Sequence, residues 1–185
     1  MLINLIKSIL VSPIDGWDSL DKSERVSTTA GFNLLVNLAL IAGIISFVGI
    51  SISSEGSFVL AIKYFGYISL KWLFSILFAS WAIAKLARGF KGIMSMPKTL
   101  IIISLCSSIL IISISLGHIF PVAKVFFYLL SSIGVVYYYF ALNKLSGLSH
   151  ERVPGFLLIS LLVLALIVFI VEMVLVLIFN IPVHL

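Results

Sequence analysis

Charged residues are scarce in this chain, and so are the residue types that most enzymes use for catalysis. Only 10% of its 185 residues are Asp, Glu, Lys or Arg, against about 25% in soluble domains. The single cysteine, Cys106, excludes an internal disulfide. His118, His150 and His184 lie far apart in different loops or ends, which excludes a shared metal site. No phosphate loop or nucleophile elbow occurs, so we expect no enzyme, no cofactor and no metal.

Long apolar stretches make up most of the chain instead. Hydrophobic residues account for 62% of it, against about 45–50% in soluble domains. The most apolar stretch, residues 154–181, contains one charge, Glu172, and is longer than the about 20 residues that a bilayer requires. Four other stretches, more often interrupted by polar or charged residues, predict spans at 31–52, 58–87, 98–116 and 122–145. The sequence therefore predicts an all-α polytopic membrane protein, with five transmembrane helices forming a compact bundle over residues 31–185.

Residues 1–30 are predicted to be a cytoplasmic or interfacial segment. Within residues 1–11, the apolar side chains recur at helical spacing, and the stretch is too short to span. It is expected either to lie in the membrane interface as a short amphipathic helix or to pack against the bundle. Ser12, Pro13 and Asp15 then predict a second helix start, and Trp17 is expected to anchor that helix at the membrane surface.

The distribution of Lys and Arg predicts the orientation in the membrane. The net charge of +5 would suggest a nucleic-acid binder in a soluble protein, but in a membrane protein the side on which the charges lie is decisive, and no nucleic-acid partner is expected. Lys124 alone lies on one side, and nine lie on the other: Lys7, Lys22, Arg25, Lys85, Arg88, Lys91, Lys98, Lys144 and Arg152. The positive-inside rule therefore places the N-terminus in the cytoplasm and the C-terminus outside.

Four of these charges, Lys85, Arg88, Lys91 and Lys98, surround the loop between the second and third spans. We expect this loop to contact anionic lipid headgroups or an acidic partner at the cytoplasmic surface. Alternatively, the four charges only fix the orientation of the chain.

Polar residues inside the spans are the other candidate site. Glu172 is costly in lipid and requires a partner. Lys71 lies at a comparable depth on the antiparallel second span, whereas Lys63 is shallower and able to reach the interface. Asn33 and Asn37 share one face of the first span and are competing partners, as are tyrosines of the second span. We predict that Glu172 is buried, faces the second span and bonds to Lys71, either as a structural link or as part of a proton, ion or substrate pathway.

Three short motifs are spread over most of the chain: the entry segment 12–17, the glycine-bearing basic loop 89–92 with Pro97 opening the third helix, and the fourth loop around 141–149. These motifs resemble those of the YIP (Ypt-interacting protein) family of small five-span membrane proteins, in its bacterial branch. This resemblance implies a compact five-helix bundle with a cytoplasmic N-terminus, no established enzyme activity, and residence in a bacterial cytoplasmic membrane.

Two functions follow as hypotheses. The first is a non-enzymatic scaffold or accessory subunit that associates, within the lipid bilayer, with another membrane protein or with a second copy of itself. The alternative is a small transporter or lipid-handling protein that uses the intramembrane Glu172–Lys71 site.

Overall fold

The computed structural model describes Trp17, residues 28–53 and residues 57–181. Within these residues the chain is helical and contains no strand. The long helices are α3 (Thr28–Ser53), α4 (Phe58–Gly89), α5 (Met96–Ile119), α6 (Lys124–Leu145) and α7 (Val153–Phe179), with a short 3₁₀ helix η1 (Pro121–Ala123) before α6. Each long helix is long and apolar enough to cross a membrane. This confirms the predicted all-α class and its five long apolar helices.

The predicted span ends agree with the helix ends to within three residues. The last span was expected to run to 181, but α7 stops at Phe179 because Asn180 adopts the left-handed conformation, with φ 46°. The third span was expected to begin at 98, but α5 begins at Met96, with Pro97 in its first turn, where a missing N–H has no effect. The predicted helix in residues 1–11 lies outside the described residues.

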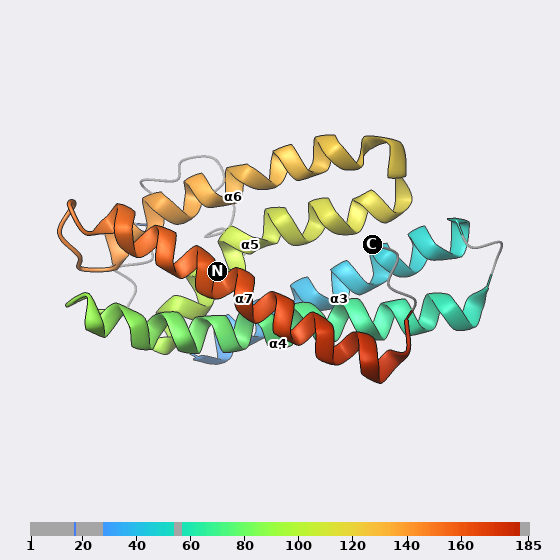
Figure 1. The fold of residues 1–185 in the computed structure, drawn as a ribbon, viewed down its shortest axis with the longest axis horizontal. Helices are drawn as coiled ribbons and strands as arrows, with labels where there is room; N and C mark the ends of the chain where they lie inside the picture. The colour runs from blue at the N-terminus through green and yellow to red at the C-terminus, as the bar shows by residue number, and fades with distance from the viewer. Residues whose placement is uncertain (1–16, 18–27, 54–56, 182–185) are drawn as a thin grey trace.

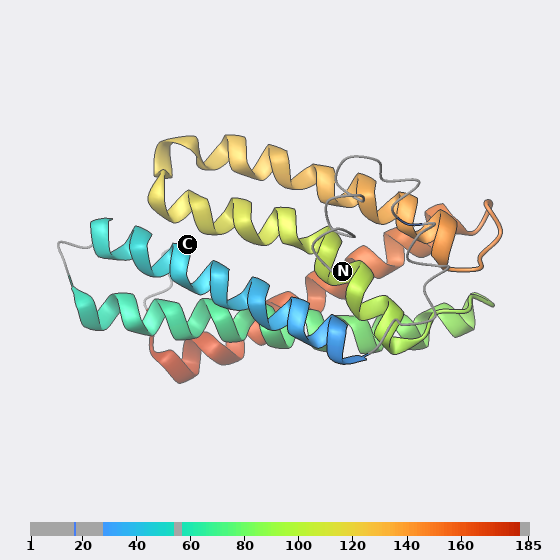
Figure 2. The same cartoon turned by 180° about the vertical axis from the view of Figure 1, so that it is seen from behind.

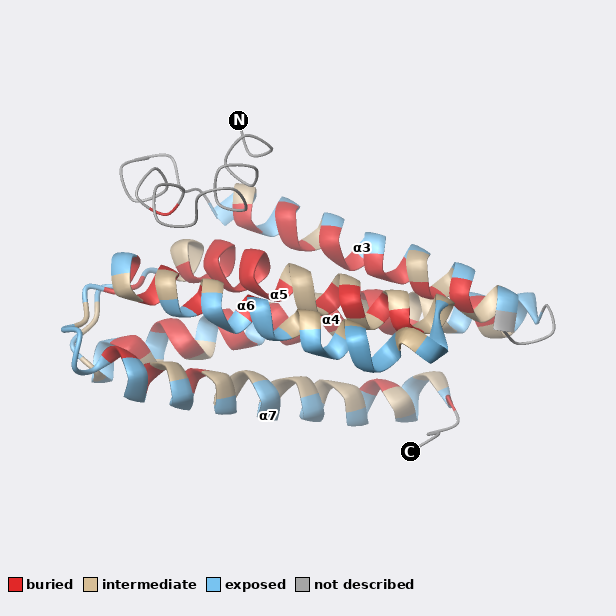
Figure 3. Cartoon of the chain, turned by 90° about the horizontal axis from the view of Figure 1, so that it is seen from above, coloured by how far each residue is buried: buried red, intermediate tan, exposed pale blue. Residues whose placement is uncertain are grey.

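The helices form a bundle in which α5 is the most buried and α7 the least. Seen from behind in Figure 2, α3 lies along α4 with α5 beside it. Figure 1 shows α7 crossing α4 obliquely, and α4 is the helix with which α7 makes most of its contacts. The exposure colouring of Figure 3 places α3 and α7 on opposite sides of the bundle, each with one exposed face.

The bundle has two ends of different character. The basic end carries the loops 90–95 and 146–152, with the clustered Lys and Arg residues nearby. The opposite end carries the α5–α6 connection at 120–123 and the last turns of α3 and α7. The orientation of the chain in a membrane is defined by which of these two ends faces the cytoplasm.

Small residues let the inner helices approach closely. Gly43 of α3, four residues after Ala39, lies against Ser69 and Phe65 of α4. Gly134 of α6 lies against the backbone carbonyl of Cys106 in α5. Such contacts provide van der Waals packing, which is the main attraction between helices where lipid removes the hydrophobic driving force.

Trp17 was expected at the membrane surface, and that expectation is wrong. Its side chain is fully buried and belongs to the hydrophobic core. An indole buries a large apolar area, and burial against helices provides more contacts than an interface position does.

Substituting Gly134 tests the close approach of α5 and α6. Gly134→Ala places a methyl group against the Cys106 carbonyl, which is backbone and cannot move aside. We expect a loss of about 1–3 kcal/mol in stability. Gly155→Ala is the matched control, because nothing lies near that position and Ala favours helix. Unfolding is followed in detergent by the reaction of the buried Cys106 thiol with a fluorogenic maleimide on heating. Equal melting temperatures for the two variants would contradict the prediction.

Candidate intramembrane polar site

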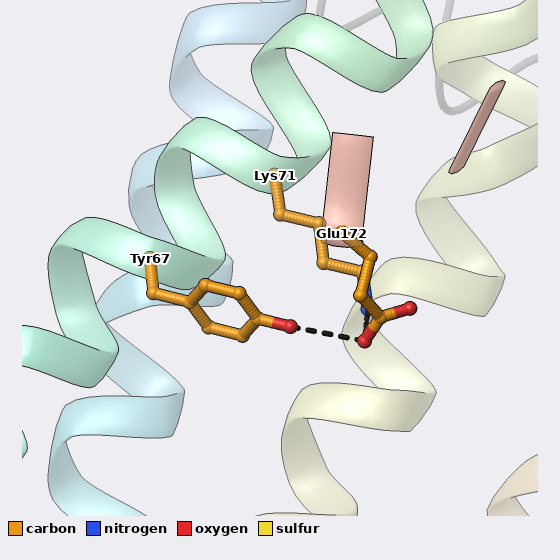
Figure 4. Close-up of polar contacts among 3 residues, drawn as sticks. All are labelled: Tyr67, Lys71 and Glu172. Carbon is orange, nitrogen blue, oxygen red and sulfur yellow. Dashed lines mark hydrogen bonds and ion pairs between the residues drawn. The ribbon is translucent and has the colours of Figure 1, made fainter. Parts of the chain in front are cut away.

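Glu172 of α7 is held by two donors from α4. Lys71 Nζ lies 2.7 Å from Glu172 Oε1, and Tyr67 Oη donates to the same oxygen at 2.9 Å. Figure 4 shows both α4 side chains reaching toward the carboxylate. The predicted pairing of Glu172 with Lys71 is confirmed, and Tyr67 is a second partner.

Helical spacing explains why α4 supplies both donors. Tyr67 and Lys71 are four residues apart, so they lie one above the other on one face of α4. The Lys71 ammonium also lies 5.9 Å from the Tyr67 ring centroid and 5.5 Å from that of Trp72. These rings stabilise the cation, which is mostly buried, by cation–π interactions.

Only half of the carboxylate is satisfied. Both donors reach Oε1, and no donor to Oε2 is found among the described residues. The Glu172 side chain is 39% exposed, whereas Lys71 is 13% exposed. The prediction that Glu172 is buried in the bundle is therefore wrong. The physical reason is that α7 lies at the edge of the bundle, where α4 covers only one side of it.

Sequence reasoning missed a polar extension of this site. His118 Nδ1, in the last turn of α5, lies 3.0 Å from Ser46 Oγ of α3. The Tyr64 ring bridges the two groups, with centroids 6.4 Å from the His118 ring and 6.2 Å from the Tyr67 ring. Tyr64, Tyr67 and Lys71 recur at spacings of three and four along α4, and this periodicity was the available signal.

This polar cluster (Ser46, Tyr64, Tyr67, Lys71, His118 and Glu172) joins α3, α4, α5 and α7 in the half of the bundle nearer the opposite end. The backbone of His118 packs directly on Gly49 of α3. A side chain at Gly49 would push α5 away, so this glycine permits the contact between Ser46 and His118.

The structure does not bring Asn33, Asn37 or Lys63 into the cluster. Lys63 is exposed on α4 and makes no contact with Glu172. Asn33 and Asn37 are exposed on α3, on the other side of the bundle from α7 (Figure 3). The prediction that they compete for Glu172 is therefore wrong. A spacing of four residues shows that two side chains share one face of a helix, but it does not show which way that face points.

The basic loop lies at the basic end of the bundle, far from the polar cluster. Lys85, Arg88 and Lys91 are exposed, whereas Lys98 is partly buried. The Lys85 ammonium stacks 3.9 Å from the ring centroid of the exposed Trp81. The loop is fixed to its neighbour, because Ile93 N donates to Ser146 O at 2.8 Å. Exposed cations beside an exposed indole are typical of a membrane interface.

No cluster of three His, Cys, Asp or Glu side chains suited to a metal ion occurs among the described residues. Comparison with known proteins also finds no counterpart: no family model, no curated protein and no solved structure matches the chain. The resemblance to the YIP family therefore stays a prediction from sequence motifs.

A double-mutant cycle tests whether Lys71 and Glu172 act as a pair. Lys71→Met leaves an unpaired carboxylate and Glu172→Gln leaves an unpaired ammonium, and each is expected to cost about 1–3 kcal/mol. The double variant should be more stable than either single variant, because it leaves no unpaired charge. Lys63→Met is the control and should change stability by less than about 0.5 kcal/mol. Melting temperatures in detergent measure all four. Strictly additive losses would show that the two charges are not coupled.

Proposed function

We propose that this protein is a non-enzymatic scaffold or accessory subunit of a bacterial cytoplasmic membrane, which binds another membrane protein through α7. The observation that carries the proposal is the half-satisfied carboxylate of Glu172. Hydrocarbon chains offer no hydrogen-bond donor to Oε2, so an unpaired oxygen at this depth is costly. A donor on a neighbouring transmembrane helix would satisfy it.

The surroundings of Glu172 suit a helix as its partner. The exposed side chains of α7 are large and apolar: Leu158, Ile159, Leu162, Leu166, Phe169, Ile170, Met173, Val174, Leu177 and Ile178. Such a face gains little from a polar or charged soluble partner. A transmembrane helix carrying Lys, Arg, Asn, Ser or Trp would pack against it and donate to Oε2. Partner recognition then combines van der Waals packing with one directional polar contact.

The charge distribution supports the orientation of the proposed scaffold. The basic end, with Lys85, Arg88 and Lys91 exposed, faces the cytoplasm by the positive-inside rule. Each such charge near an anionic leaflet is worth about 1 kcal/mol. The basic loop is thus proposed to hold this end at the headgroups, and the polar cluster lies in the outer half of the membrane.

A small transporter or lipid-handling protein is the second candidate. The observations that favour it are the polar row from His118 to Glu172 and an apolar groove between α4 and α7. That groove is lined by Phe74 and Phe78 of α4 and by Val171 and Val174 of α7. Flux of protons or of a labelled lipid in liposomes, lost in Glu172→Gln, would favour this candidate over the scaffold.

Site-directed labelling tests the proposed orientation. Single cysteines at Ser57 and Ser149, both exposed, are introduced into a Cys106→Ser chain. With an impermeant maleimide applied to intact cells, we expect Ser57→Cys to react and Ser149→Cys to react only after the membrane is opened. If both cysteines react from the same side, the chain does not cross the membrane an odd number of times between positions 57 and 149, and the proposed topology is wrong.

Photo-crosslinking in native membranes tests the α7 interface. Phe169 of α7 and Phe126 of α6 are both 60% exposed, and each is replaced in turn by the photoreactive residue benzoylphenylalanine. We expect one discrete, stoichiometric adduct from position 169, since it lies one turn from Glu172, and none from position 126. Introducing Glu172→Gln should reduce the adduct at least severalfold, because an amide N–H₂ replaces an acceptor. Equal adducts at both positions, or an adduct indifferent to Glu172→Gln, would refute the α7 interface.

A further inference from the structure

Asn33 and Asn37 are amides exposed on the outer face of α3. Neither makes a hydrogen bond or ring contact with any side chain in the described part of the chain. Each is a donor and an acceptor at once. They share this face with large apolar side chains, of which Leu40 is 42% and Ile44 is 55% exposed.

The depth of the two amides differs. At 1.5 Å per residue, Asn33 lies about 7 Å and Asn37 about 13 Å from the start of α3 at Thr28. A hydrocarbon layer of about 30 Å centred on this helix begins about 4 Å from the same point. Asn33 is therefore able to reach the headgroup region, whereas Asn37 lies about 9 Å inside the apolar layer. Lipid offers Asn37 no partner.

The four side chains also follow a definite pattern. Asn33, Asn37, Leu40 and Ile44 are spaced by four, three and four residues, which is the seam of a heptad repeat. In parallel coiled coils, one asparagine on the seam fixes register and oligomeric state. In membranes, asparagine amides hydrogen-bond between helices in the same way.

From this we infer that the seam (Asn33, Asn37, Leu40 and Ile44) pairs with the same seam on a second copy of the chain, and that the Asn37 amides of the two copies hydrogen-bond to each other. Copies inserted with the same orientation are related by a two-fold axis along the membrane normal. Such an axis places identical residues at identical depths. An amide is self-complementary under that symmetry, because its N–H₂ donates to the carbonyl of its twin.

The same argument excludes α7 as the self-pairing helix. Two Glu172 carboxylates brought together by a two-fold axis would repel each other, and neither has a proton to donate when ionised. The α3 seam thus fits a second copy, while Glu172 fits a donor from a different chain. The inference stands apart from the proposed function, since it concerns another helix on the other side of the bundle (Figure 3).

Disulfide crosslinking in liposomes at low protein-to-lipid ratio tests the pairing. In a Cys106→Ser background, Leu40→Cys and Ile44→Cys should each form a covalent dimer on mild oxidation. Leu166→Cys of α7, which is 59% exposed and also near the middle of its helix, measures random collision. Dimer from position 40 no greater than from position 166, or adducts of a mass other than twice the chain, would overturn the inference.

Variants at Asn37 then test the amide pair itself. Asn37→Leu should weaken dimerisation about sevenfold, since two interhelical hydrogen bonds are lost, and Asn37→Gln should restore most of the affinity. Because Asn37 is exposed, neither variant should change the melting temperature of the chain. Energy transfer between labelled copies in liposomes measures the dimer constant. If Asn37→Leu dimerises with unchanged affinity, the role assigned to the amide is wrong. This result does not depend on whether α7 binds a partner.

Discussion

A polar or charged group among apolar side chains is costly unless it is paired. This cost accounts for the polar contacts between the helices of the bundle. The Lys71–Glu172 pair, at 2.7 Å, is the clearest case. Neither ion is stable alone in a bilayer, and together they tie α7 to α4. Since α7 packs mainly on α4 and is otherwise exposed, this link fixes the position of the outermost helix. Van der Waals packing at small residues such as Gly43 and Gly134 holds the inner helices.

The sequence predicted the five long helices because apolar length and helix-ending residues are local properties. Pro97 and the basic loop marked the start of α5, and the run 154–181 marked α7 to within two residues. Glu172 was paired correctly with Lys71, because depth along two antiparallel helices follows from residue counts alone. The family resemblance and the function stay predictions, because no known protein matches the chain and so none tests them.

What the sequence did not predict is the direction in which each helix face points. Asn33 and Asn37 were named as competing partners of Glu172 and instead lie exposed on α3. His118 was assigned to a loop, yet the structure places it in α5 against Ser46. The direction in which a helix face points depends on the neighbouring helices. The usual sign of a buried face is that it is more apolar than the outer face. In a membrane this sign is lost, because apolar residues cover both the buried and the lipid-facing sides. Trp17, buried rather than at the surface, is a further example.

Glu172 and Asn37 differ in chemistry, so the partners proposed for them also differ. Glu172 Oε2 is an acceptor only, so it selects a chain that brings a donor. Asn37 is donor and acceptor, so it accommodates its own symmetry mate. Because α3 and α7 lie on opposite sides of the bundle (Figure 3), occupation of one face leaves the other accessible. A dimer formed through α3 would therefore present two α7 faces directed away from its axis, which is the arrangement that a membrane scaffold requires to bring two partner proteins together.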